Sequence, residues 1–208
     1  MKKTQFRWTP VLITVLFATL LWFITFALNW STFWIKISFS SASLAAVSLW
    51  LQRHEKTRFR FDKKAVFFGL ASAALLYVIF VTGKIISIRL FSFAENQIGG
   101  IYSQGEGTPS WVIAMLLFFV TGPSEELYWR GYLQRQLMRR LGGLQGWVAA
   151  TAVYAGVHIC SLNLVLIGAA GVAGAFWGAM YRRLENLAPV IISHSVWSAV
   201  IFTVAPLS

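Results

Sequence analysis

The chain has 208 residues, of which 57% are hydrophobic and only 12% are charged. A water-soluble domain carries about twice that charged fraction, so the composition excludes an ordinary soluble fold and indicates an integral membrane protein. The net charge of +11 does not indicate a nucleic-acid partner, because the basic residues gather at the ends of apolar runs. The single cysteine, Cys160, excludes a disulfide bond within the chain.

Long apolar runs dominate the sequence, and about 20 apolar residues cross a bilayer as a helix. We therefore expect an all-α, polytopic membrane helix bundle that forms a single domain over residues 1–208. The first run resembles a signal peptide, but it is long enough to span the bilayer and no clear cleavage site follows, so we expect it to be retained. Seven spans are predicted, or eight if the chain breaks near 84–93: residues 10–30, 32–51, 65–84, 110–138, 144–160, 163–181 and 187–206.

Basic residues alternate along the chain with loops that are nearly free of them. Under the positive-inside rule, this alternation predicts a cytoplasmic N-terminus and an external C-terminus. We expect a multi-pass protein of the cell membrane whose basic loops contact anionic lipid. The basic residues that carry this prediction are Lys2, Lys3, Arg7, Arg53, Lys56, Arg58, Arg60, Lys63, Lys64, Arg135, Arg139, Arg140, Arg182 and Arg183.

Two further segments have a simple structural interpretation. The glycine-rich stretch 94–109 is expected to be a flexible loop between the third and fourth spans. In the sixth predicted span, Ala170, Gly174 and Gly178 recur every four residues and form a smooth face. Such a face predicts close packing against a neighbouring helix.

Ionisable side chains are costly at membrane depth, so Glu125, Glu126 and Arg130 in the fourth predicted span require an explanation. Glu126 and Arg130 are four residues apart and can pair on one helix face. Glu125 lies about 100° round the helix and can point elsewhere. The paired carboxylate is expected to stay ionised and structural, which makes Glu125 the better general base. Pro123 is expected to disturb the helix one turn earlier.

Two histidines on later spans turn this pair of carboxylates into a candidate site. At 1.5 Å per residue, Glu125 lies about 21 Å along its helix from Arg139, His158 about 22 Å from Gly143, and His194 about 16 Å from Arg183. Polar groups from three helices at a similar depth predict a wet cavity inside the bundle. Ser198 follows His194 by one turn, so its hydroxyl either points to the same place or bonds back to the His194 carbonyl.

Several other interpretations of these residues remain open. Glu126 and Arg130 could simply clamp the bundle together, and a polar cavity could serve as an ion or proton pathway. A zinc site made of Glu125, His158 and His194 is a second chemical alternative, although the motif His-Glu-x-x-His is absent. A serine protease is disfavoured because Ser161 and Ser195, which lie beside the histidines in the sequence, cannot form a Ser–His pair on one helix face.

The ordered set Glu125-Glu126-x-x-x-Arg130, Tyr154-x-x-x-His158 and His194-x-x-x-Ser198 resembles the CPBP family. These are the CAAX protease and bacteriocin-processing (Abi) intramembrane proteases, which include type II CAAX prenyl endopeptidases. The resemblance covers about residues 110–200. It divides the domain into variable N-terminal helices, 1–109, and a CPBP-like catalytic core, 110–205.

The resemblance implies a helical bundle with a glutamate-dependent site that opens toward the cytoplasmic side. Glu125 with His158 would activate a water that attacks a peptide carbonyl, and His194 and Ser198 would stabilise the oxyanion. Glu126 and Arg130 would support the site. The expected activity is an intramembrane endopeptidase acting on a membrane-associated or lipid-modified peptide or protein, without a cofactor or, alternatively, with zinc bound by Glu125, His158 and His194.

The chain departs from the family pattern at two positions. Tyr154 stands where phenylalanine is usual, and Ser198 stands where asparagine is usual, which shortens the oxyanion donor. Some family members are thought to act as binding or immunity proteins. The alternative function is therefore a non-catalytic immunity or regulatory membrane protein that retains the protease fold.

Overall fold

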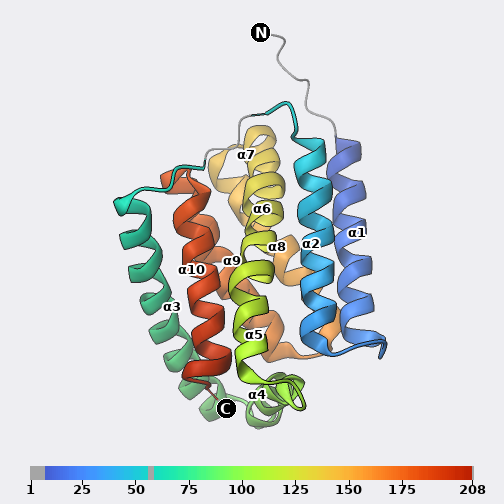
Figure 1. Cartoon of the computed structure of the whole chain (residues 1–208), viewed down its shortest axis with the longest axis vertical. Helices are drawn as coiled ribbons and strands as arrows, with labels where there is room; N and C mark the ends of the chain where they lie inside the picture. Colours follow the sequence, from blue (N-terminus) through green and yellow to red (C-terminus); the bar gives the residue numbers. More distant parts are fainter. Residues whose placement is uncertain (1–7, 56–58, 208) are drawn as a thin grey trace.

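The computed structural model describes residues 8–55 and 59–207. Throughout these residues the chain forms helices and no strands, which confirms the all-α bundle (Figure 1). Lys2, Lys3, Arg7, Lys56 and Arg58, which contributed to the predicted orientation, lie outside the described residues.

Five helices in the described part of the chain are long and apolar enough to cross a membrane. They are α1 (Trp8–Ala27), α2 (Phe33–Leu51), α3 (Lys63–Leu90), α9 (Leu164–Leu184) and α10 (Leu187–Ala199) with its π-helical continuation Val200–Val204. A sixth candidate is a pair of segments, Ala94–Gly105 and Ser110–Leu141, that are bent by 93° relative to each other. The remaining predicted span corresponds to α8 (Gly143–Val157), whose 15 residues are fewer than a bilayer crossing ordinarily needs.

The fourth predicted span is a composite helix. It consists of α5 (Ser110–Leu116), a π-helical turn (Leu117–Thr121), α6 (Gly122–Tyr128), a second π-helical turn (Trp129–Gln134) and α7 (Arg135–Leu141). Pro123 lacks an N–H and its ring clashes with the carbonyl four residues earlier, so a regular helix cannot continue through it. The predicted disturbance is therefore present, as a widened turn directly before the glutamates.

The stretch 94–109 is not the flexible loop that we expected. Residues Ala94–Tyr102 form a helix, α4, and Ser103–Gly105 form a 3₁₀ turn. Ala94 and Ile98 are buried one helical turn apart, so this segment gains apolar contacts. A Cβ at Gly99 or Gly100 would meet nothing, which places both glycines on an open face where each costs the helix only about 1 kcal/mol. Helix α4 lies across one end of the bundle (Figure 1).

The opposite end of the bundle, which we call the basic end, is formed by the α2–α3 connection, α7 and the α9–α10 turn. Hydrogen bonds hold these segments together: Glu55 accepts from Arg135 and, at 2.7 Å, from Arg139, and the Arg60 N–H donates to Asn186 at 2.9 Å. Figure 1 shows these segments together at the end opposite α4. The described basic residues of this end are Arg53, Arg60, Lys63, Lys64, Arg135, Arg139, Arg140, Arg182 and Arg183.

The predicted smooth face of α9 packs closely against α8. A Cβ added to Gly174 would lie 2.8 Å from Cδ1 of Tyr154, and one added to Gly178 would lie 2.6 Å from Cδ1 of Trp147. Real Cβ atoms do not approach other atoms so closely, so glycine is required at both positions for this packing. The close approach also brings the backbone carbonyls of α9 within reach of side chains from the composite helix.

Candidate active site

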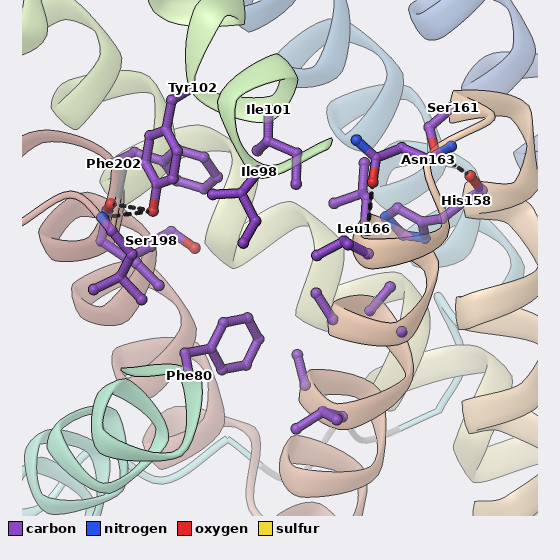
Figure 2. A pocket seen from close by; sticks show the side chains of 18 of the residues that line it. Phe80, Ile98, Ile101, Tyr102, His158, Ser161, Asn163, Leu166, Ser198 and Phe202 are labelled. Carbon is purple, nitrogen blue, oxygen red and sulfur yellow. Dashed lines mark hydrogen bonds between the residues drawn. The ribbon is translucent and has the colours of Figure 1, made fainter. Parts of the chain in front are cut away.

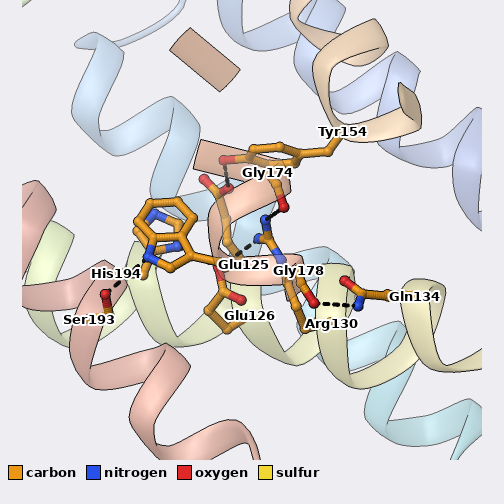
Figure 3. Close-up of polar contacts among 10 residues, drawn as sticks. Glu125, Glu126, Arg130, Gln134, Tyr154, Gly174, Gly178, Ser193 and His194 are labelled. Carbon is orange, nitrogen blue, oxygen red and sulfur yellow. Dashed lines mark hydrogen bonds and ion pairs between the residues drawn. The ribbon is translucent and has the colours of Figure 1, made fainter. Parts of the chain in front are cut away.

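Glu126 is the centre of a buried polar cluster (Figure 3). Its Oε1 atom accepts hydrogen bonds from Nη1 of Arg130 and from Nδ1 of His194, both at 2.7 Å. The predicted Glu126–Arg130 ion pair is therefore present, and it also includes a histidine from α10. A buried carboxylate is tolerated when cationic and N–H groups surround it in this way.

Arg130 lies in the second π-helical turn and connects three helices. Its Nη2 atom donates to the carbonyl of Gly174 at 3.2 Å, and its Cζ lies 4.9 Å from the ring centre of Tyr154 and 5.5 Å from that of Trp177. The planar guanidinium can make hydrogen bonds along its edge while its face contacts aromatic rings, which an ammonium group cannot do. Arg130 thus fixes the spacing between α6, α8 and α9.

Glu125 points away from this pair and has different neighbours. The hydroxyl of Tyr154 on α8 donates to its Oε2 atom at 3.0 Å. Glu125 lines the main cavity of the protein, whereas Glu126 does not. The hydroxyl that distinguishes Tyr154 from a phenylalanine supplies this hydrogen bond.

His158 begins the 3₁₀ turn that follows α8, and both of its ring nitrogens have partners. Nδ1 donates to the Tyr154 carbonyl at 2.8 Å, since a carbonyl can only accept. Nε2 accepts from the indole N–H of Trp22 at 3.3 Å, since an indole can only donate. These partners define the neutral tautomer with its proton on Nδ1.

Trp22 is a site residue that the sequence did not reveal. It lies on α1 and is fully buried, within the part of the chain that carries no family motif. Apolar residues surround it in the sequence, so its pattern there is that of any membrane-spanning tryptophan. No local signal distinguishes it, because its role depends on the contact between α1 and the end of α8.

His194 is held in one orientation by its neighbours. The indole of Trp177 stacks on the imidazole with ring centres 3.9 Å apart and planes 17° from parallel. The indole N–H of Trp177 donates to the Ser193 hydroxyl at 3.1 Å, which in turn fixes the tryptophan. With Nδ1 bound to Glu126, the edge of the ring that carries Nε2 remains for the cavity, which His194 lines.

One cavity of about 720 Å³ brings the candidate catalytic residues together: Glu125, His158, His194 and Ser198 all line it. The supporting residues Glu126 and Arg130 lie behind its wall. Most of the other lining side chains are aliphatic or aromatic, and they come from α2, α3, α4, α9 and α10. Figure 2 shows Phe80 of α3 and Leu166 of α9 on facing sides of this space.

The cavity extends from Glu125 toward the α4 end of the bundle. Its lining there includes Ile98, Tyr102 and Gln104 from α4 and the turn after it, and Phe33 at the start of α2. Asn163 donates to the Gln97 carbonyl at 2.8 Å, which ties the start of α9 to α4. None of the described basic-end residues lines the cavity.

The alternative zinc set does not form in the described residues, where no group of three or more His, Cys, Asp or Glu side chains is placed to hold a metal ion. His158 uses both nitrogens for Trp22 and Tyr154, and His194 gives Nδ1 to Glu126. The side chains in this arrangement therefore do not fit a zinc site, and the chemistry below uses none.

Comparison with known families gives one match. The sequence profile of a family described as type II CAAX prenyl endopeptidase Rce1-like matches residues 107–200. The matched segment contains Glu125, Glu126, Arg130, His158 and His194, together with Ser198 near its end. No curated protein and no solved structure shows significant similarity to the chain.

Proposed function

Residues 107–200 belong to the type II CAAX prenyl endopeptidase Rce1-like family, and on this premise we propose that the protein is an intramembrane endopeptidase. It hydrolyses a peptide bond in a membrane-associated or lipid-modified peptide or protein. The observation that carries the proposal is the gathering of one carboxylate, Glu125, and two imidazoles, His158 and His194, around a single cavity. Three separate helical segments supply these groups.

Glu125 is the general base of the proposed reaction. Tyr154 holds its Oε2 atom, which leaves Oε1 to accept a hydrogen bond from a water in the cavity. Glu126 cannot take this role, because it lies outside the cavity lining, with its Oε1 atom bound to Arg130 and His194. As the water oxygen attacks the substrate carbonyl carbon, one water proton moves to Glu125.

His158 completes the water site beside Glu125. Tyr154 connects the two residues, since its hydroxyl donates to Glu125 and its backbone carbonyl accepts from His158. Trp22 occupies the basic nitrogen of His158 and Tyr154 occupies the other, so the ring of this histidine bounds the water site while Glu125 takes the proton.

His194 stabilises the negative charge that develops on the substrate oxygen. In the proposed step His194 acts as an imidazolium: its Nδ1–H donates to Glu126 and its Nε2–H donates to the oxyanion. Ser198, one turn later on α10, adds a hydroxyl donor on the same side of the cavity. Collapse of the tetrahedral intermediate breaks the C–N bond, and Glu125 returns its proton to the leaving amine.

The proposal includes seven membrane crossings in the cell membrane and a cytoplasmic N-terminus. The crossings are α1, α2, α3, the composite helix α5–α7, α8, α9 and α10. Each connection of the basic end then faces the cytoplasm, in line with the positive-inside rule. The crossing made by α8 requires the following 3₁₀ turn, His158–Ser161, to complete it.

A cleavage assay with purified protein and a membrane-anchored peptide library tests the proposed activity. We expect Glu125→Gln to lower the rate by at least about 100-fold, because a general base contributes 10²–10⁴-fold. Glu106→Gln is the matched control, since Glu106 is exposed and outside the cavity lining. Equal rates for wild type and Glu125→Gln would refute the proposed mechanism.

A non-catalytic immunity or regulatory protein is the second candidate. Two observations favour it: Ser198 offers a shorter donor than asparagine, and Trp22 occupies Nε2 of His158. In this case Glu125→Gln would leave the cellular phenotype intact while the protein remains folded and present in the membrane.

A further inference from the structure

The two ends of the bundle differ strongly in charge. Within residues 8–55 and 59–207, the basic end has nine lysines and arginines against three acidic residues, Glu55, Asp62 and Glu185. The α4 end has three basic residues, Lys36, Lys84 and Arg89, against two acidic ones, Glu95 and Glu106. Among those three, Lys36 is buried and donates to the Leu28 carbonyl at 2.7 Å, so its charge is not on the surface. The positive-inside rule therefore assigns the basic end to the cytoplasm.

The cavity is closed on the side of the basic end. Between the site and that end, the composite helix carries Arg130, Leu133 and Gln134, each no more than 2% exposed. Gln134 donates to the Gly178 carbonyl of α9 at 2.8 Å, which holds the two helices together there. A peptide cannot pass through side chains packed in this way.

The cavity reaches the surface at the α4 end. Its lining includes side chains that are exposed to solvent or lipid, namely Phe91 after α3, Gln104 after α4 and Leu164 at the start of α9. Its walls are the last turns of α3 together with α10 on one side and the first turns of α9 on the other, with α4 across the top in Figure 2. The opening thus lies where a membrane-spanning segment would leave the bilayer at this end.

Together these observations make two expectations from the sequence incompatible. A cytoplasmic N-terminus and a site that opens toward the cytoplasm cannot both hold in this fold, because the cavity opens at the end opposite the basic residues. Resting on the proposed function, we propose that the active site is entered from the external side of the membrane. Its substrate is an exported, membrane-anchored polypeptide, cut where the chain leaves the bilayer, rather than a cytoplasmic lipid-modified C-terminus.

The chemistry of the cavity fits such a segment. Aromatic and aliphatic walls, such as Phe80 and Ile98, suit the apolar end of a membrane anchor, and polar groups such as Gln104 and Asn163 near the opening suit an extended, hydrated peptide. Glu125 lies deeper, so the chain must enter the cavity with its anchor still in the lipid. The scissile bond is then within a few residues of the anchor.

Cysteine labelling in sealed cells tests the sidedness independently of catalysis. Cys160 is first replaced by serine, and one glutamine is then changed: Gln104→Cys at the α4 end or Gln145→Cys at the basic end, both exposed positions. A membrane-impermeant maleimide should label Gln104→Cys in sealed cells and Gln145→Cys only after permeabilisation. Protection of Gln104→Cys, or labelling of Gln145→Cys, in sealed cells would overturn the proposal.

A sided reporter tests the substrate class. In the reporter, a single-span membrane protein carries the same peptide-library segment next to the membrane, on either the external or the cytoplasmic side. Each reporter is expressed together with the wild-type protein or with its Glu125→Gln variant. We expect cleavage of the external segment alone, at least about 100-fold slower with Glu125→Gln. Cleavage of the internal segment alone would overturn the sidedness and keep the endopeptidase. Cleavage of neither, with Gln104→Cys labelled from outside, would overturn the proposed function and with it the substrate class.

Discussion

The indole nitrogen of Trp22 donates a hydrogen bond to Nε2 of His158 across 3.3 Å, between the first helix and the end of α8. The two rings also pack in a T-shaped arrangement, with their centres 5.9 Å apart. This contact ties the N-terminal helices to the family-like half of the chain at the site itself. It also occupies the only basic atom of His158, which is why the mechanism gives proton transfer to Glu125.

Trp22→Phe should lower kcat by about 3- to 10-fold and leave KM nearly unchanged. The change removes the donor to Nε2 while keeping an aromatic ring, so His158 loses its orientation but the cavity keeps its shape. The rate of peptide cleavage over a range of substrate concentrations measures the effect.

Trp129→Phe is the control for this change. Trp129 is equally buried, and its indole nitrogen has no hydrogen-bond partner among the described residues. Equal kinetic effects of the two substitutions would show that packing, and not the hydrogen bond, explains the loss at Trp22.

Tyr154→Phe should reduce stability and slow the reaction without abolishing it. The buried Oε2 atom of Glu125 loses its donor, which costs about 1–3 kcal/mol of folding free energy. We expect kcat to fall by about 10-fold, because Glu125 can then rotate away from the water. Thermal unfolding and cleavage kinetics measure the two effects.

The matched variant for Tyr154→Phe is Tyr128→Phe, which removes a hydroxyl from a fully buried tyrosine outside the cavity lining. It should change kcat by less than about 2-fold, since no atom near Glu125 is altered. A Tyr154→Phe enzyme as fast and as stable as wild type would contradict a positioning role for the hydroxyl.

Arg130→Lys should destabilise the fold by about 3 kcal/mol even though the charge is conserved. The guanidinium of Arg130 binds Glu126 and the Gly174 carbonyl through its edge while its face contacts Tyr154 and Trp177. The ammonium of a lysine has no planar face and cannot make both kinds of contact at once. Thermal unfolding in detergent measures the loss. Arg140→Lys, on the exposed surface of α7, should have no measurable effect, and equal losses would show that lysine is harmful for a general reason.

The sequence predicted the parts of this site that depend on spacing within one helix. The Glu126–Arg130 pair and the separate direction of Glu125 follow from the helical period, and both are present. The expectation that His158 and His194 lie near Glu125 came from residue counts along their spans, and all three residues line one cavity. All of these predictions needed only the local geometry of a helix.

The parts that failed depend on contacts between segments far apart in the chain. Neither Trp22, at the contact of α1 with the end of α8, nor the helix in 94–102 could be predicted, because Ala94 and Ile98 become a buried face only against the assembled bundle. The side on which the cavity opens is a property of all the helices together. Single-segment patterns therefore carry no signal for it.

Chelators should leave peptide cleavage unchanged. Both ring nitrogens of His158 are used by Trp22 and Tyr154, which leaves a zinc ion only Nε2 of His194, and the proposed base acts through a carboxylate. Cleavage rates are compared before and after treatment with EDTA and with 1,10-phenanthroline, followed by dialysis. Loss of activity that zinc alone restores would show that the site rearranges around a metal.

Gly168→Phe should block the cavity without harming the fold. Gly168 lines the cavity on α9, and a Cβ there would meet no atom within 4 Å, so a larger side chain can extend into the space that the substrate needs. Replacing glycine also favours the helix by up to about 1 kcal/mol. We expect cleavage to fall by at least about 10-fold, with unchanged or higher thermal stability.

Gly156→Phe is the matched control for Gly168→Phe, because its Cβ also meets nothing and it lies on α8 outside the cavity lining. It should leave the cleavage rate within about 2-fold of wild type, since its side chain extends away from the substrate. If Gly168→Phe cleaves peptide as fast as Gly156→Phe, the space between α3 and α9 does not hold the substrate. In that case a different route must bring the peptide to Glu125.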